Sequence, residues 1–151
     1  MNSYQVAYDK AMAETISLTD PRDQYFAWYN AGTSLVKLQD YVGAASAYDS
    51  TFAIYPSITQ KYRPYRMLWY QTGPYFAYYY TSRYQDVINL ATTTLDTDVE
   101  QVLEESFHWR ALAKEALGDR AGAIADLRNA VSVHPGFPPS VEQLIAFGET
   151  P

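Results

Sequence analysis

The chain has 151 residues, of which 48% are hydrophobic and 19% charged, and its formal net charge at pH 7 is −6. This length and composition suffice for an apolar core and exclude disorder for most of the chain. The absence of cysteine excludes disulfides, thiolate metal sites and a cysteine nucleophile. No stretch is apolar enough to span a membrane, and the start at Met1 lacks the features of a signal peptide. We therefore expect one soluble globular domain over residues 1–151.

Hydrophobic spacing predicts helices throughout, the first over residues 4–18. Asp20-Pro21 is typical of a helix start, because aspartate caps the first N–H groups and proline suits the first turn. A helical hairpin is then expected over 25–58, with a turn at Gln39-Asp40. The positions that define this hairpin are Trp28, Gly32, Tyr41, Ala44, Tyr48 and Pro56.

A second, irregular hairpin is expected over 64–98, defined by Trp69 and Tyr84. These residues lie fifteen positions apart, where Trp28 and Tyr41 lie thirteen apart. Gly73-Pro74 falls inside the expected first helix, and an internal proline kinks a helix. The sequence therefore predicts a longer, bent helix before Tyr84.

A third hairpin is expected over 104–137, and a short final helix over 139–147, which Ser140 begins as part of a capping box with Gln143. The third hairpin is defined by Ala111, Gly118, Ala123 and Pro135. The prediction for the whole chain is thus eight helices and no strands.

The recurring pattern of bulky, small, small and aromatic residues with a closing proline is similar to the tetratricopeptide repeat (TPR). Small residues let two antiparallel helices approach closely, so we expect Gly32 opposite Ala44 and Ala111 opposite Ala123. The expected fold is all-α: a right-handed TPR-like α-solenoid of about three repeats with flanking capping helices.

Residues 66–75, 77–79, 83–87, 103–106 and 109–110 together resemble the C-terminal helical-repeat region of bacterial papain-like cysteine peptidases of the bacteriocin-processing type. The resemblance covers about residues 25–137. It implies an accessory, non-catalytic part of a larger exported protein. The catalytic cysteine and histidine of such peptidases have no counterpart here, so no hydrolytic activity is implied.

In TPR proteins the first helix of each repeat lines a concave groove that holds a partner segment. Tyrosines have the best prospects there, because a ring and a hydroxyl add contact at little entropic cost. A chaperone-type carboxylate clamp is rejected, because Tyr29 and Glu105 stand where the clamp lysines would be. The predicted groove residues are Phe26, Tyr29, Thr33, Lys37, Met67, Tyr70, Tyr78, Glu105, His108 and Glu115.

No catalytic residue, metal ligand set or cofactor is predicted. Glu104 and Glu105 are neighbours on a helix, so their side chains point about 100° apart and suit the positive helix end instead. His108 and His134 are the only histidines and lack metal-binding spacing. His134 is expected to cap carbonyl groups at a helix end.

Residues 61–85, termed here the basic aromatic segment, contain Lys61, Arg63, Arg66 and Arg83, no acid, and many tyrosines. Three interpretations stay open: stacking of single-stranded nucleic acid, binding of glycans, and packing of rings beneath cations. The net negative charge speaks against the first.

The leading interpretation is a non-enzymatic module that binds a protein or peptide segment in its groove. The alternatives are a glycan- or wall-binding accessory domain and a self-associating structural spacer. We expect neither binding of nucleic acid nor insertion into a membrane. The residues themselves assign no cellular compartment, and the peptidase resemblance implies an extracytoplasmic location within a larger protein.

Overall fold

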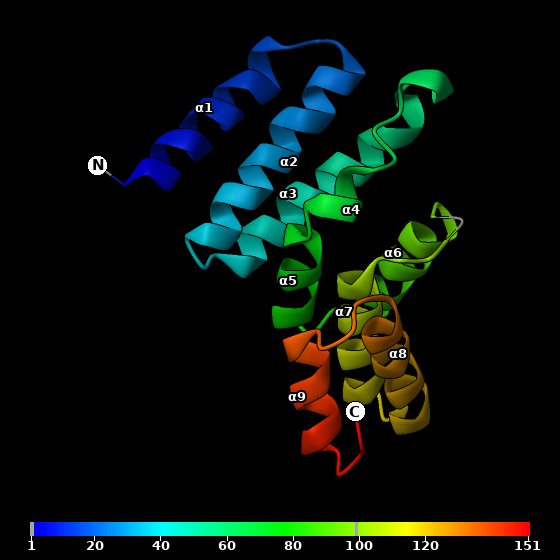
Figure 1. Ribbon diagram of the computed structural model, residues 1–151. Coiled ribbons are helices and arrows are strands. Elements are labelled where there is room, and N and C mark those ends of the chain that lie inside the picture. The colour runs from blue at the N-terminus through cyan, green and yellow to red at the C-terminus, as the bar shows by residue number, and fades with distance from the viewer. Residues whose placement is uncertain (1, 99) are drawn as a thin grey trace. The chain divides into compact units, whose positions relative to one another are not determined.

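The computed structural model describes residues 2–98 and 100–151, and within these ranges the chain is all-α, with no strand (Figure 1). Nine α-helices and two short 3₁₀-helices lie in these ranges. In chain order they are α1 (Ser3–Ser17), α2 (Pro21–Lys37), α3 (Tyr41–Ile54), η1 (Tyr55–Ser57), η2 (Gln60–Tyr62), α4 (Met67–Tyr70), α5 (Gly73–Tyr80), α6 (Tyr84–Asp96), α7 (Glu104–Ala116), α8 (Arg120–Val133) and α9 (Pro138–Ala146). The predicted all-α class is confirmed.

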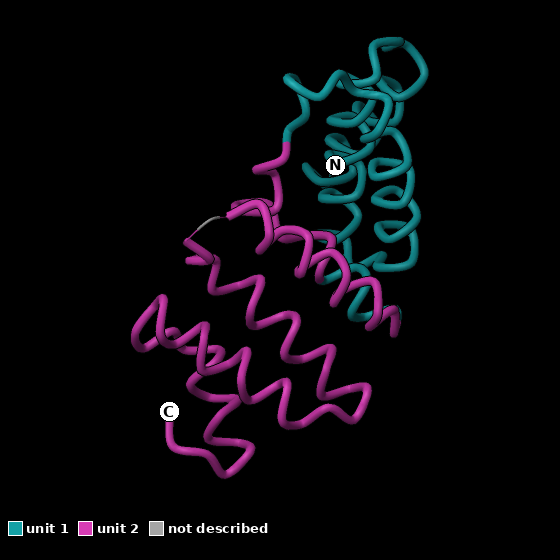
Figure 2. Tube along the Cα trace, turned by 90° about the vertical axis from the view of Figure 1, so that its right-hand side faces the viewer, with its two compact units in different colours: residues 1–64, 76–81 teal, residues 65–75, 82–151 magenta. Residues whose placement is uncertain are grey.

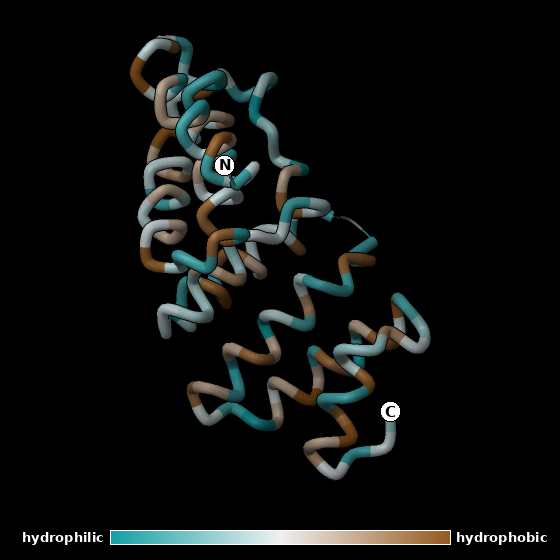
Figure 3. Tube along the Cα trace, turned by 90° about the vertical axis from the view of Figure 1, so that its left-hand side faces the viewer, coloured by the Kyte–Doolittle hydropathy of each residue, from teal (hydrophilic) through white to brown (hydrophobic). Residues whose placement is uncertain are grey.

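The chain forms two compact units, coloured separately in Figure 2. Unit 1 comprises residues 1–64 and 76–81, and unit 2 comprises residues 65–75 and 82–151. Within unit 1, α2 packs against both α1 and α3. Within unit 2, α7 packs against α6 and α8, and α9 covers α8. Hydrophobic residues recur at intervals along these helices, as expected for helices that each bury one face (Figure 3).

Helix α2 starts at the predicted capping residue. The Asp20 carboxylate accepts hydrogen bonds from the backbone N–H groups of Arg22 and Asp23, and Pro21 occupies the first turn of α2. These bonds satisfy donors that have no partner inside the helix. The predicted start is therefore correct.

The two regular hairpins, α2–α3 and α7–α8, share one turn geometry. Asp40 accepts a hydrogen bond from the N–H of Gly43 at 2.9 Å, and Asp119 accepts one from the N–H of Gly122 at 2.8 Å. Each aspartate follows a residue with positive φ, Gln39 (62°) in the first hairpin and Gly118 (88°) in the second. The predicted turns are confirmed, and the same turn geometry closes one hairpin in each unit.

Unit 1 has a core rich in tyrosine. The rings of Tyr29 and Tyr48 pack edge to face at 5.1 Å, and Tyr29 also lies against Tyr25 at 5.9 Å. Gly32 makes room for this arrangement, because a Cβ atom there would lie 2.7 Å from the Tyr48 ring. Gly32, predicted to lie opposite Ala44 at this helix crossing, thus makes room for the ring of Tyr48, which follows Ala44 by four positions.

Unit 2 combines a core of aliphatic and aromatic residues with a charge cluster around one buried carboxylate. Ala111 and Ala123 lie in one cluster with Leu127 and Leu144, which agrees with the predicted close approach of α7 and α8. Beside it, the Asp126 carboxylate binds the Arg110 guanidinium at 2.8–2.9 Å and the Lys114 ammonium at 2.8 Å. A buried carboxylate needs such partners, since desolvation penalises an isolated charge.

The predicted long, bent helix before Tyr84 is wrong. The chain instead forms α4, breaks at Gln71 and Thr72, and starts α5 at Gly73, which also raises the number of α-helices from the predicted eight to the nine in the described ranges. Pro74 is the second residue of α5, and in that position its missing N–H costs no helical hydrogen bond. The proline therefore begins a new helix instead of kinking a continuous one.

The predicted capping box at Ser140 is also wrong. Helix α9 starts earlier, because Pro138 and Pro139 occupy its first two positions. Ser140 consequently lies inside the first turn and is fully buried. Its hydroxyl group is directed to α7, where it meets His108 at 2.9 Å.

Candidate partner-binding site

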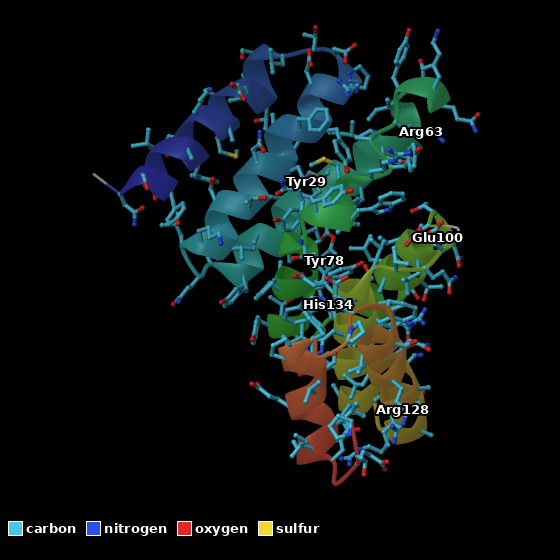
Figure 4. The ribbon with its side chains drawn as sticks, in the orientation of Figure 1. Tyr29, Arg63, Tyr78, Glu100, Arg128 and His134 are labelled. Atoms are coloured by element: carbon cyan, nitrogen blue, oxygen red, sulfur yellow. The ribbon has the colours of Figure 1, made fainter. Side chains whose placement is uncertain are left out.

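Two of the predicted groove residues belong to the core of unit 1. Tyr29 is 1% exposed and Tyr78 is 4% exposed, and both are labelled in Figure 4. The Tyr78 hydroxyl donates a hydrogen bond to the Asp49 carboxylate at 3.0 Å. Neither ring is available to a partner in this structure, so Tyr29 and Tyr78 belong to the core and not to an accessible groove.

The other groove residues of unit 1 differ in accessibility. Phe26 is half-buried beneath the Arg22 guanidinium, which lies 4.9 Å from the ring centre. Thr33 is half-buried and hydrogen-bonded to the Tyr48 hydroxyl at 3.2 Å. Lys37 is exposed in the last turn of α2, where a cation stabilises the negative helix end. These three positions thus range from hydrogen-bonded and half-buried to exposed.

Unit 2 brings two predicted groove residues, Tyr70 and Glu105, into one partly open pocket of about 70 Å³. The pocket lies between α4 and the first turn of α7. Its lining residues are Leu68, Trp69, Tyr70, Thr72, Leu103, Glu104, Glu105 and Ser106. The two sides of the pocket therefore come from two segments that lie more than thirty residues apart in the chain.

Three hydrogen bonds, one of them buried, hold the segments that line this pocket. The Trp69 indole N–H donates to the Thr97 hydroxyl at 3.1 Å. The hydroxyl groups of Tyr75 and Ser106 are 2.8 Å apart, and burial raises the pKa of Tyr75, which stays protonated. Before α7, the Asp98 carboxylate accepts a hydrogen bond from the N–H of Val102 at 2.7 Å. The pocket is thus supported on α5, α6 and α7.

The pocket rim combines an aromatic ring with acidic groups. Tyr70 is 80% exposed, and within residues 2–98 and 100–151 its side chain has no hydrogen-bond or ring partner. In the same ranges no basic side chain pairs with Glu105, whereas Glu104 lies 3.2 Å from the His134 imidazole. His134, labelled in Figure 4, thus contacts a carboxylate, and its predicted role as a carbonyl cap is wrong.

His108 lies outside this pocket, on the side of α7 that faces α9. Its Nδ1 atom is 2.9 Å from the Ser140 hydroxyl, and its ring meets Phe137 edge to face at 5.9 Å. Burial lowers the pKa of His108 to about 4, so the imidazole is neutral at pH 7. This histidine holds α9 against α7 and is not among the pocket residues.

Two other predicted groove residues also lie outside the pocket. Glu115 forms a bidentate ion pair with Arg120 at 2.6–2.7 Å, and this hydrogen bonding lowers the pKa of the Glu115 carboxyl. Met67 is the first residue of α4 and is half-buried. Sequence reasoning did not assign the other lining residues to the groove: it treated Trp69 as purely structural and Glu104 as an acid at a helix start, and it missed Leu68, Thr72, Leu103 and Ser106.

Cations cover several rings of the basic aromatic segment. Arg66 lies over Tyr65 at 5.3 Å and over Trp69 at 5.0 Å, and Lys61 lies over Tyr62 at 4.7 Å. Arg63, labelled in Figure 4, lies 5.5 Å from the Tyr55 ring and also donates to the Ile58 and Pro56 carbonyls. Such contacts are what the packing interpretation predicts. Each cation covers one face of a ring, and glycan stacking would need such a face.

The described residues contain no group of three or more histidine, aspartate or glutamate side chains placed to hold a metal ion. None of the helices in the described ranges is long and apolar enough to cross a membrane. No protein-family model matches the chain, and no curated protein matches it either.

Proposed function

We propose that the protein is a non-enzymatic, TPR-like interaction module that binds a peptide segment of a partner protein at the pocket between α4 and α7. The observation that carries this proposal is the meeting of Tyr70 and Glu105 at one pocket. Large exposed aromatic rings without intramolecular partners are common anchors of protein interfaces. The hairpins α2–α3 and α7–α8, with their shared aspartate turn, support the TPR-like assignment.

Replacing Tyr70 by alanine is expected to weaken partner binding about tenfold while leaving the fold intact. The ring is mostly exposed, so its loss changes the free energy of unfolding by at most about 0.5 kcal/mol. Peptides selected from a random-peptide phage library on the immobilised wild-type chain supply the ligand, and isothermal titration calorimetry gives the affinities.

Tyr62→Ala is the matched control, since Tyr62 is 57% exposed and lies outside the pocket. It is expected to bind the selected peptides as the wild type does. Selected peptides that bind Tyr70→Ala with undiminished affinity would contradict the proposed function.

We propose further that this module is an accessory part of a larger exported, peptidase-like protein, as the resemblance of residues 66–75 and 103–106 implies. The mass of the native polypeptide in source cells and medium tests this. A product far larger than 17.1 kDa outside the cell is expected, whereas a product of 17.1 kDa inside the cell would rule it out.

A further inference from the structure

The pocket between α4 and α7 has the chemistry of a receptor for a positively charged side chain. We infer that it takes an arginine side chain of the bound segment, with the guanidinium against the Tyr70 ring and near the Glu105 carboxylate. This inference rests on the proposed function and specifies the chemistry of the partner.

The first argument is the ring. Tyr70 lies at the pocket with its side chain mostly exposed and, in the described part of the chain, without a ring or hydrogen-bond partner. The neighbouring Trp69 already carries the Arg66 guanidinium at 5.0 Å from its ring. Because Arg66 is held over Trp69 and Tyr65, it leaves the Tyr70 ring for an external group. A planar guanidinium stacks on such a ring more favourably than an ammonium group does.

The second argument is the charge of the lining. Two carboxylates, Glu104 and Glu105, line the pocket, and no lysine or arginine does. The positive end of α7 offsets only about half a charge. Glu104 is engaged by His134, so Glu105 is the carboxylate left to pair with a ligand. The Glu105 carboxylate therefore offers a partner to a cationic side chain and none to an acidic one.

The third argument is size. A water molecule needs about 10–15 Å³ of such space, and the pocket offers about 70 Å³. This volume admits the head group of one side chain and excludes a folded element. The apolar residues Leu68 and Leu103 line the same pocket and provide contact for the aliphatic stem of an arginine.

Two short acetylated peptides, identical except for a central arginine or its neutral analogue citrulline, test the inference on the full-length protein labelled with ¹⁵N. The arginine peptide is expected to shift the Trp69 indole N–H signal and the backbone N–H signals of residues 103–106. It is expected to bind about three- to tenfold more tightly than the citrulline peptide.

The variant Glu105→Gln is expected to abolish this preference for arginine, and raising the salt concentration should reduce it. Glu142→Gln is the matched control, because Glu142 is an exposed acid on α9 outside the pocket. It should retain the preference. Equal affinity for the two peptides, or no signal shift at the pocket with the arginine peptide at millimolar concentration, would overturn the inference.

The two proposals fail in different ways. If both peptides bind equally and Tyr70→Ala weakens both, only the choice of an arginine is wrong, and the site remains a peptide-binding site. If phage-selected peptides bind independently of Tyr70, the proposed function itself is wrong.

Discussion

Replacing Tyr29 by alanine is expected to lower the free energy of unfolding by about 3–5 kcal/mol. The Tyr29 ring is 1% exposed and packs against Tyr25 and Tyr48 in the core of unit 1. Its removal leaves a cavity that these neighbours cannot fill without losing their own contacts, so the transfer and cavity costs add. Urea unfolding followed by circular dichroism measures the change.

Comparing Tyr29→Ala with Tyr70→Ala shows which of the two tyrosines is a core residue and which lies on an accessible surface. Both tyrosines were predicted to line it, but only Tyr70 is exposed. Tyr70→Ala is expected to unfold at the wild-type urea concentration, and Tyr29→Ala well below it. Wild-type stability of Tyr29→Ala together with weakened peptide binding would restore Tyr29 to the groove and refute the core assignment.

The second large effect is a loss of stability in acid caused by His108. Its folded-state pKa is about 4, below the value of about 6.5 expected in the unfolded chain. Between these values the unfolded state binds a proton that the folded state does not, so the free energy of unfolding falls as the pH falls from 6.5 to 4. The loss amounts to up to about 3 kcal/mol, is absent above pH 6.5, and does not grow below pH 4.

Variants separate this effect from the titration of carboxylates. His108→Gln removes the imidazole and is expected to flatten the stability profile between pH 4 and 6.5 relative to the wild type. His134→Gln is the matched control, because it removes the other, more exposed imidazole and leaves the contact between His108 and Ser140 in place. The NMR titration of the His108 ring protons gives the pKa directly, and a value near 6.5 would contradict the burial argument.

The structure explains which local features the sequence could predict. Asp20, Asp40 and Asp119 act on N–H groups two or three residues away, so their capping needs no knowledge of the tertiary fold. Proline was harder to interpret, because the same residue kinks one helix or starts another. Pro74 and Pro138 both fall in a first turn, which shifted the predicted boundaries of α5 and α9.

The site was less predictable than the helices. Repeat spacing nominated Tyr29 and Tyr70 alike, but it does not tell which ring a neighbouring helix covers. Gly32 decides this for Tyr29, since it admits the Tyr48 ring against which Tyr29 packs. The pocket depends on Trp69 and Leu103, which are brought together by tertiary folding, and no spacing rule predicts such a pair.

Extensive contacts between helices join elements that follow one another in the chain: α1 with α2, α2 with α3, α6 with α7, α7 with α8, and α8 with α9. Short loops close each of these pairs, so little chain entropy is lost before packing begins, and rapid folding is the consequence. Among these paired helices, amide hydrogen exchange should therefore be slowest in α2 and α7, each packed between two helices, and faster in α1, whose extensive contacts are with α2.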